Sequence, residues 1–357
     1  MDEGSRIALI DVDGQLATVA ADGSRLTRLT HGERVFQFPA WAPDNRTLAA
    51  IGGGAGGTGV YLIPADAGAT PQRLRSIHAS DGNAPIYLSW SPNGAILSIL
   101  AAHAQLQLAL FLAQVPDDNL DRLTPVLGGQ PCFWHWRADS HGLLAHVDLG
   151  RRTAQLTHVR WQTLDQPTLQ PIDVRPGPFQ APGISYDGQL LAYAQMTAGG
   201  DSQLVVAGRE RRIVIGAYDG LIAFGWSPTG DQLAFIHPLT ANEHFYGPLH
   251  IWHGANEQVQ RLTNETVVAF FWSPDGRRIA FVAAPNEVVA QRNHDGRVNG
   301  YVGKAWPFAE QRSAPVRLTL SVIELSSGLV DTLLNFTPVA PFVNQYLPFF
   351  DQYAKSH

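Results

Sequence analysis

Cysteine and lysine are almost absent from this chain of 357 residues. Its one cysteine, Cys132, excludes an internal disulfide and a thiolate metal cage. The two lysines, Lys304 and Lys355, leave little basis for Schiff-base or lysine-base chemistry. Charged residues make up 16% of the chain and the net charge is −6, so the clustered basic surface that nucleic-acid binding requires is missing. We therefore expect no nucleic-acid partner.

Long apolar runs are also missing. No window reaches the roughly 18 apolar residues of a membrane-spanning helix, and the first five residues lack the basic and apolar regions of a signal peptide. As written, the sequence predicts a cytoplasmic protein with no membrane span. A chain from which a leader had been removed would instead be periplasmic or extracytoplasmic.

Turn-forming residues are plentiful, with 34 glycines and 24 prolines. Such frequent interruption favours many short strands over long helices. One glycine-rich run, residues 52–57, lacks the Gly-Lys-Ser/Thr ending of a phosphate loop. We interpret it as the tip of a β-hairpin.

A repeat organises the chain. The segment Trp272-Ser273-Pro274-Asp275-Gly276, followed by Ile279-Ala280-Phe281, recurs in intact or degenerate form along the sequence. The repeat anchors are Trp41, Trp90, Trp136, Ile184, Trp226 and Trp272. Their spacing of 42 to 49 residues is typical of the blades of a β-propeller.

Each copy predicts a hairpin followed by two more strands. Proline fixes φ and glycine accepts positive φ, so the Ser-Pro-Asp-Gly segment turns the chain between the first and second strands. The spacing, after an insertion at about 285–315 is set aside, predicts seven four-stranded antiparallel blades in a single domain over residues 1–357. Because residues 6–10 match a second strand, we expect residues 346–353 to supply the missing first strand. Pairing of the N- and C-terminal strands would then close the ring and remove exposed edges.

The Trp-Ser-Pro-Asp-Gly repeat, intact at Trp272 and nearly so at Trp226, resembles that of TolB-type (WD-like) β-propellers. The resemblance covers essentially the whole chain, from Arg6 to Tyr353. It implies an all-β propeller, and it differs from TolB in that this chain shows no separate N-terminal domain and no signal peptide.

Two repeats carry long connections on the side of the molecule opposite the Ser-Pro-Asp-Gly turns. Long loops that the fold does not need are commonly functional, and arginine and aromatic residues are frequent anchors of protein interfaces. We expect a partner- or ligand-binding surface there, with no metal and no catalytic residue. Its candidate residues are His237, Asn242, Glu243, His244, Tyr246, Arg292, His294, Asp295, Arg297, Tyr301 and Trp306.

A second candidate location is the channel lined by the residues just before each anchor. These are Phe38, Tyr87, Phe133, Trp134, His135, Phe224, Phe270 and Phe349. We interpret most of these rings as core between blades. Strand alternation sends His135 to the face opposite Trp134 and Trp136.

No acid–base pair or activated nucleophile stands out, which favours a non-catalytic protein without a cofactor. The leading hypothesis is a TolB-like propeller that acts as a protein-interaction scaffold through its loops. The alternative is a small-molecule or carbohydrate site at the channel mouth, or a metal-assisted lyase in which a cation held by residues such as His237 and His244 acidifies a substrate proton. Both a protein partner and a small molecule therefore remain open at this point.

Overall fold

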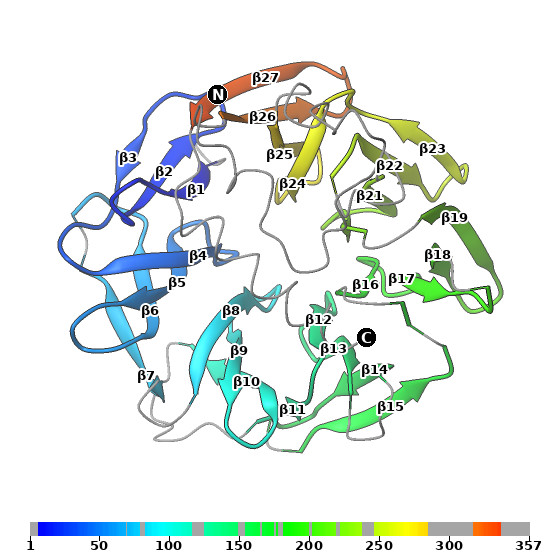
Figure 1. The fold of residues 1–357 in the computed structure, drawn as a ribbon, viewed down its shortest axis with the longest axis horizontal. Helices are drawn as coiled ribbons and strands as arrows, with labels where there is room; N and C mark the ends of the chain where they lie inside the picture. The colour runs from blue at the N-terminus through cyan, green and yellow to red at the C-terminus, as the bar shows by residue number, and fades with distance from the viewer. Residues whose placement is uncertain are drawn as a thin grey trace, which may run out of the picture. The chain divides into compact units, whose positions relative to one another are not determined.

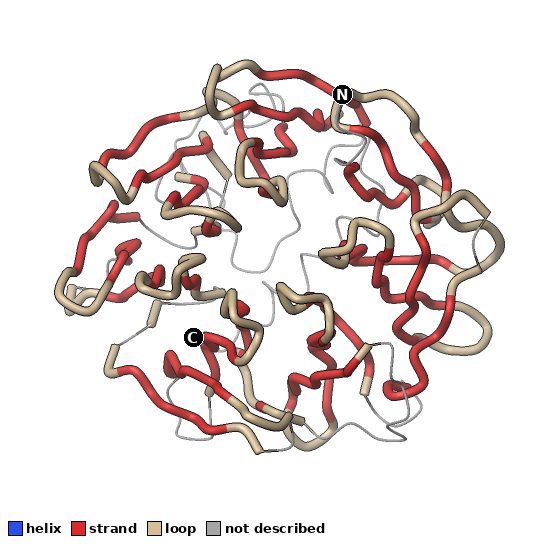
Figure 2. Tube along the Cα trace, turned by 180° about the vertical axis from the view of Figure 1, so that it is seen from behind, coloured by secondary structure: helices blue, strands red, loops and turns tan. Residues whose placement is uncertain are grey.

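The computed structural model describes residues 6–68, 70–78, 83–115, 125–148, 154–164, 166–174, 176–177, 181–199, 202–218, 222–237, 246–284 and 317–336. In this part of the chain every regular element is a β-strand, and Figure 2 shows only strands and loops. The strands form seven antiparallel sheets, which are the blades of a β-propeller. The predicted all-β, seven-bladed fold is therefore confirmed. No helix in the described part of the chain is long and apolar enough to cross a membrane.

Blades are numbered 1 to 7 in chain order, and within each blade the strands lie side by side in sequence order (Figure 1). The first four blades are β1 (Arg6–Ile10), β2 (Leu16–Ala20) and β3 (Thr27–Arg28); β4 (Val35–Trp41), β5 (Thr47–Gly53), β6 (Gly59–Pro64) and β7 (Gln72–His78); β8 (Ala84–Trp90), β9 (Ile96–His103), β10 (Gln107–Gln114) and β11 (Leu127–Gly128); and β12 (Cys132–Trp136), β13 (Gly142–Val147), β14 (Gln155–Arg160) and β15 (Thr168–Ile172). The last three are β16 (Gly183–Ile184), β17 (Leu191–Met196), β18 (Ser202–Ala207) and β19 (Arg212–Tyr218); β20 (Phe224–Trp226), β21 (Gln232–Ile236), β22 (Leu249–His253) and β23 (Gln258–Arg261); and β24 (Thr266–Trp272), β25 (Arg278–Ala284), β26 (Leu318–Glu324) and β27 (Val330–Phe336).

Blade 1 has three described strands, whereas the other blades have four. The strand expected to complete it, residues 346–353, lies outside the described residues, so ring closure stays a prediction. The chain forms two compact units, one of residues 1–176 and 181–193 and the other of residues 177–180 and 194–357. The prediction of a single domain over residues 1–357 is likewise not tested.

Side-chain hydrogen bonds fix the Ser-Pro-Asp-Gly turns. In blade 7 the Ser273 hydroxyl donates to Asp275 Oδ1 over 2.5 Å and accepts from the Arg278 backbone N–H over 2.9 Å. Gly276 takes a positive φ of 68° and donates its N–H to the Ser273 carbonyl. The corresponding turns in blade 3, at Ser91-Asn93, and in blade 5, at Ser185-Asp187, have the same side-chain bonds. The repeated residues thus build a closed turn whose polar side chains are already paired.

Adjacent turns also touch each other. In the second unit, Thr229 of blade 6 donates its hydroxyl to the Asp275 carbonyl of blade 7 over 3.2 Å. A Cβ at Gly276 would lie 2.3 Å from the Thr229 hydroxyl, so this close approach requires glycine. In the first unit, Ser140 of blade 4 accepts the Asn93 backbone N–H of blade 3 over 3.1 Å. The Ser-Pro-Asp-Gly turns therefore help to hold neighbouring blades in place.

Three anchor tryptophans, Trp90, Trp136 and Trp272, form polar links between neighbouring sheets. Trp90 donates its indole N–H to the Ala40 carbonyl of blade 2, and Trp272 donates to the Gly225 carbonyl of blade 6. Blade 4 uses a side chain instead, because Trp134 and Trp136 both donate to the hydroxyl of Ser98 in blade 3, over 3.0 and 3.1 Å. In these blades the tryptophan of the repeat is therefore a hydrogen-bond donor as well as a packing residue, whereas the indole nitrogens of Trp41 and Trp226 have no partner among the described residues.

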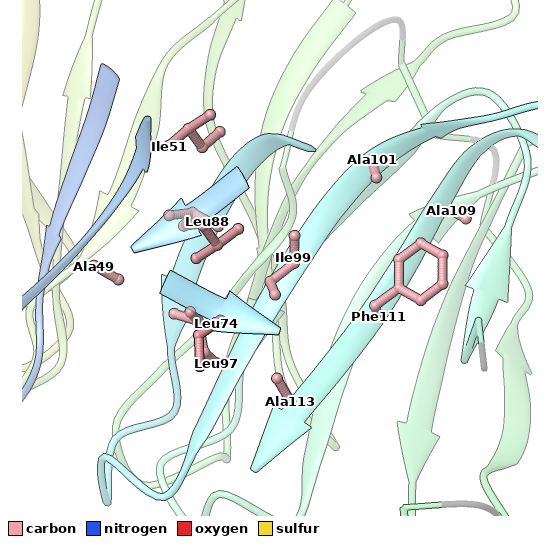
Figure 3. Close-up of a cluster of buried hydrophobic side chains, with 11 residues drawn as sticks. Ala49, Ile51, Leu74, Leu88, Leu97, Ile99, Ala101, Ala109, Phe111 and Ala113 are labelled. Atoms are coloured by element: carbon pink, nitrogen blue, oxygen red, sulfur yellow. The ribbon is translucent and has the colours of Figure 1, made fainter. Parts of the chain in front are cut away.

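Apolar side chains fill the space between blades 2 and 3, as Figure 3 shows. Ile51 and Val60 come from blade 2, and Ile99 and Phe111 from blade 3; all four are at most 4% exposed. Each fully buried side chain of this size contributes roughly 1.5–3 kcal/mol. A similar cluster around Phe281 and Ile236 joins blades 6 and 7.

We predict that Ser98→Ala destabilises the protein by about 2–4 kcal/mol, because two buried indole N–H groups then lose their acceptor. The hydroxyl also donates to the Ser89 carbonyl over 2.6 Å. The matched control is Ser89→Ala, since Ser89 contributes only its backbone to this network. Urea unfolding measures both, and an equal loss of stability in the two variants would contradict the assignment.

Candidate functional site

Only two of the predicted contact residues, His237 and Tyr246, lie in the described part of the chain. The other candidates lie outside the described residues: Asn242, Glu243, His244, Arg292, His294, Asp295, Arg297, Tyr301 and Trp306. Phe349 of the second candidate location lies outside them as well. The strands before and after the two long connections are described, and they show where each connection leaves and re-enters its blade.

Connections between the second and third strands of a blade differ sharply in length. In blades 2 and 3 they comprise residues 54–58 and 104–106. In blades 6 and 7 they comprise residues 237–248 and 285–317. The long connections of the Trp226 and Trp272 repeats thus lie between the second and third strands of blades 6 and 7.

The two long connections have neighbouring stems in the second unit. Gly247, just after the first connection, forms an isolated bridge with Val267 of β24, with N–H···O bonds of 3.2 and 2.9 Å. Val267 in turn pairs with Ala283 of β25, and the second connection begins after Ala284. One ladder of backbone pairs therefore joins the end of the first long connection to the start of the second.

His237 sits at the beginning of the first long connection, in a cluster of three rings. Its backbone N–H donates to the Pro248 carbonyl over 3.1 Å, which holds the residue at the end of the β21–β22 hairpin. Phe235 and His250 are direct cross-strand partners, and their rings stack with centroids 5.4 Å apart. The His237 ring lies 5.6 Å from that of His250 and nearly perpendicular to it.

Burial lowers the pKa values of both His237 and His250. For His250, the nearby His237 and Arg261 lower the pKa further. Its Nδ1 lies 3.0 Å from the Pro248 carbonyl, which only accepts, so the neutral ring carries its proton on Nδ1 and leaves Nε2 as an acceptor. At neutral pH the cluster is therefore uncharged, with two half-buried imidazoles beside the buried phenyl ring of Phe235.

His250 was not anticipated from the sequence. Two features place it in the cluster. Strand alternation in β22 sends His250 and Trp252 to the same face, and the pairing register sets them opposite Phe235 and Leu233. Sequence inspection alone does not reveal that register, because the long connection hides the offset between the two strands.

In the described part of the chain the structure contains no group of three or more His, Cys, Asp or Glu residues that could hold a metal ion. The Cys132 thiol is buried, which raises its pKa to about 12 and leaves it protonated. The metal-assisted lyase alternative thus gains no ligand set from these residues.

Aromatic rings run across blades 2, 3 and 4 in the first unit. Phe38 and Tyr87 meet edge to face at 6.0 Å, and Tyr87 and Trp134 at 5.8 Å. Trp134 is 8% exposed, as expected of core, but Tyr87 is 47% exposed. Phe133, Phe224 and Phe270 are half-buried.

β-Bulges precede Ala40 in β4 and Tyr87 in β8, and Phe38 has a positive φ of 51°. The bulges re-aim these side chains, which strict alternation would not have indicated.

His135 lies on the face opposite Trp134 and Trp136, as predicted. Its Nδ1 accepts the Ile184 N–H of blade 5 over 3.4 Å, whereas both indoles bond to blade 3. Burial lowers its pKa to about 4. The imidazole is therefore a neutral, structural hydrogen-bond acceptor at physiological pH.

We predict that this histidine makes the protein acid-sensitive. The unfolded chain binds the proton near pH 6.5 but the folded chain only near pH 4, so stability is full above 6.5 and falls as the pH drops towards 4. Relative to His135→Asn, which keeps an acceptor but cannot titrate, the wild type should lose about 3 kcal/mol between pH 7 and pH 4. Urea unfolding across this range measures the difference, and parallel pH profiles for the two proteins would refute it.

Comparisons with known proteins show the fold of this chain. No protein-family model and no curated protein matches the sequence. Among solved structures, a putative TolB from Agrobacterium tumefaciens is similar over 94% of this chain and 91% of its own, with 13% identity and a TM-score of 0.48. The periplasmic gluconolactonase PpgL from Pseudomonas aeruginosa is similar over 93% of this chain and 96% of its own, with 17% identity and a TM-score of 0.52.

The tricorn protease is similar over 98% of this chain, with 10% identity and a TM-score of 0.63, although the match spans only 35% of the protease chain. Because a gluconolactonase and part of a protease are both similar in fold to this chain, the fold does not point to one chemistry. The chain is therefore a seven-bladed β-propeller, and its Trp-Ser-Pro-Asp-Gly repeats resemble those of TolB-type propellers.

Proposed function

We propose that this chain is a non-catalytic propeller that binds a protein partner through the long connections of blades 6 and 7. The contact surface would comprise the candidate residues His237, Asn242, Glu243, His244, Tyr246, Arg292, His294, Asp295, Arg297, Tyr301 and Trp306. The observation that carries the proposal is the Gly247–Val267–Ala283 ladder, which joins the stems of both connections.

The chemistry of the described stem supports a contact role. His237 and His250 are held uncharged beside Phe235, so a partner would meet rings that are inexpensive to desolvate. Among the described residues, neither imidazole contacts a carboxylate or hydroxyl that would make it a base for a nucleophile. Such a surface suits binding better than proton transfer.

The sequence of the second connection supports the same role. Residues 285–316 contain arginine, tyrosine and tryptophan, which commonly act as interface anchors, and few residues typical of a flexible linker. The other end of the strands offers less, because its serine and aspartate side chains are already paired within their own turns.

The decisive experiment replaces residues 286–315 with a short glycine-serine linker. Partners identified by pull-down and mass spectrometry with the wild type would be purified and their affinity measured for both proteins. We expect at least a tenfold weaker affinity for the deletion variant, with an unchanged urea unfolding midpoint.

Two point variants sharpen this test. Trp306→Ala should weaken binding, whereas Leu329→Ala, which truncates a 68% exposed side chain on a short turn of the same blade, should not. Full affinity in a folded deletion variant would refute the proposal.

A further inference from the structure

Two glycines face each other across the second and third strands of blade 2. Gly52 of β5 and Gly59 of β6 are cross-strand partners, and Phe36 and Tyr61 lie beside them on the same face of the sheet. The pair leaves a gap in the side-chain layer at the end of the blade. Two arginine side chains occupy this gap.

Arg34 lies over the first glycine. Its guanidinium Cζ is 4.5 Å from the centroid of the Tyr61 ring, a cation–π arrangement. A Cβ at Gly52 would lie 2.9 Å from Arg34 Cδ and 2.7 Å from Tyr61 Cδ2. The absence of a side chain at Gly52 is thus what lets Arg34 lie against the sheet.

Arg73 lies over the second glycine. It pairs with Tyr61 across β6 and β7, and a Cβ at Gly59 would lie 2.6 Å from its Nε. Its terminal nitrogens donate to the Gly56 and Thr58 carbonyls over 3.4 and 3.2 Å. The two arginine side chains therefore lie over two glycines that face each other across β5 and β6.

The positive charge of this pair is not neutralised by the described part of the protein. Some other arginines have acidic partners there: Arg28 bonds to Asp11 and Asp13, Arg137 to Asp139, and Arg211 to Glu257. Neither Arg34 nor Arg73 forms an ion pair with any acidic residue that the structure describes. In addition, the Nε atoms of both are buried and have no hydrogen-bond partner.

The buried Nε–H groups of both arginines have no acceptor in the described part of the chain, and leaving a buried donor unpaired is costly. We propose that Arg34 and Arg73 form a binding site for a phosphate group, which we call the arginine pair site. A phosphate monoester carries about −1.5 to −2 charge at pH 7, which matches two guanidinium groups. The planar guanidinium can also donate two parallel N–H bonds to phosphate oxygens.

The arginine pair site differs from the phosphate loops of nucleotide-binding proteins. The glycine-rich run 52–57 comprises the end of β5 and most of the connection to β6, and it does not precede a helix, so it contributes no helix dipole. Here the glycines make room for side chains, and the arginines supply the donors. The site also lies within the first unit and does not depend on the proposed protein interface.

Isothermal titration calorimetry of the full chain with inorganic phosphate, at low ionic strength, tests the site. We expect saturable binding of one phosphate per chain, weakened at least tenfold in both Arg34→Gln and Arg73→Gln. The matched control is Arg46→Gln, which removes an exposed arginine without an ion pair elsewhere in blade 2 and should leave the affinity unchanged. Arg73→Lys, which keeps the charge but loses the planar donors, should bind with intermediate affinity.

A titration with O-phosphoserine distinguishes free phosphate from a phosphate monoester as the preferred ligand, and saturable binding of either supports the site. The proposal is overturned if the wild type shows no saturable binding of either probe, or if Arg46→Gln weakens binding as much as the two site variants do. Urea midpoints of all variants, measured without phosphate, show whether each one is folded.

Discussion

Sheets that stack face to face cannot pair their strands in one ladder, and this constraint governs the described parts of the protein. The strands of each blade pair with one another, so apolar packing must hold neighbouring blades together, and a few hydrogen bonds between blades must set their alignment. The indole N–H groups of Trp90 and Trp272 fill that role by reaching carbonyls of the preceding blade. Ser98 performs the same task for Trp134 and Trp136, which explains why a polar residue is fully buried in an apolar layer.

The connections at the two ends of the strands consequently differ in how much their lengths vary. At the turn end, serine and aspartate side chains close each turn, and the contact of Thr229 with Gly276 allows little variation. At the other end, strand-to-strand connections range from residues 104–106 in blade 3 to residues 285–317 in blade 7. Variation in length is tolerated where it does not disturb the links between blades, and that is where binding residues can accumulate.

Much of the fold was predictable because the repeat combines turn chemistry with a constant period. Trp272-Ser273-Pro274-Asp275-Gly276 specifies a turn locally, and its recurrence predicts the number of blades without any knowledge of contacts. Strand alternation also predicted correctly which face of its sheet the His135 side chain occupies.

The candidate sites were less accessible to such reasoning. The exposure of Tyr87 depends on a bulge, and the position of His250 beside Phe235 depends on a register across a long connection. The approach of Arg34 and Arg73 depends on which residues oppose each other across three strands. These features depend on how segments pair with one another, and the sequence pattern of a single strand does not reveal that pairing.

The burial of Cys132 has a practical consequence. A protonated thiol inside the sheet does not react with maleimides or alkylating probes, so the natural chain is already suited to site-specific labelling. A single cysteine introduced at an exposed position such as Leu329 would carry one fluorophore or spin label per molecule, without prior removal of the native residue.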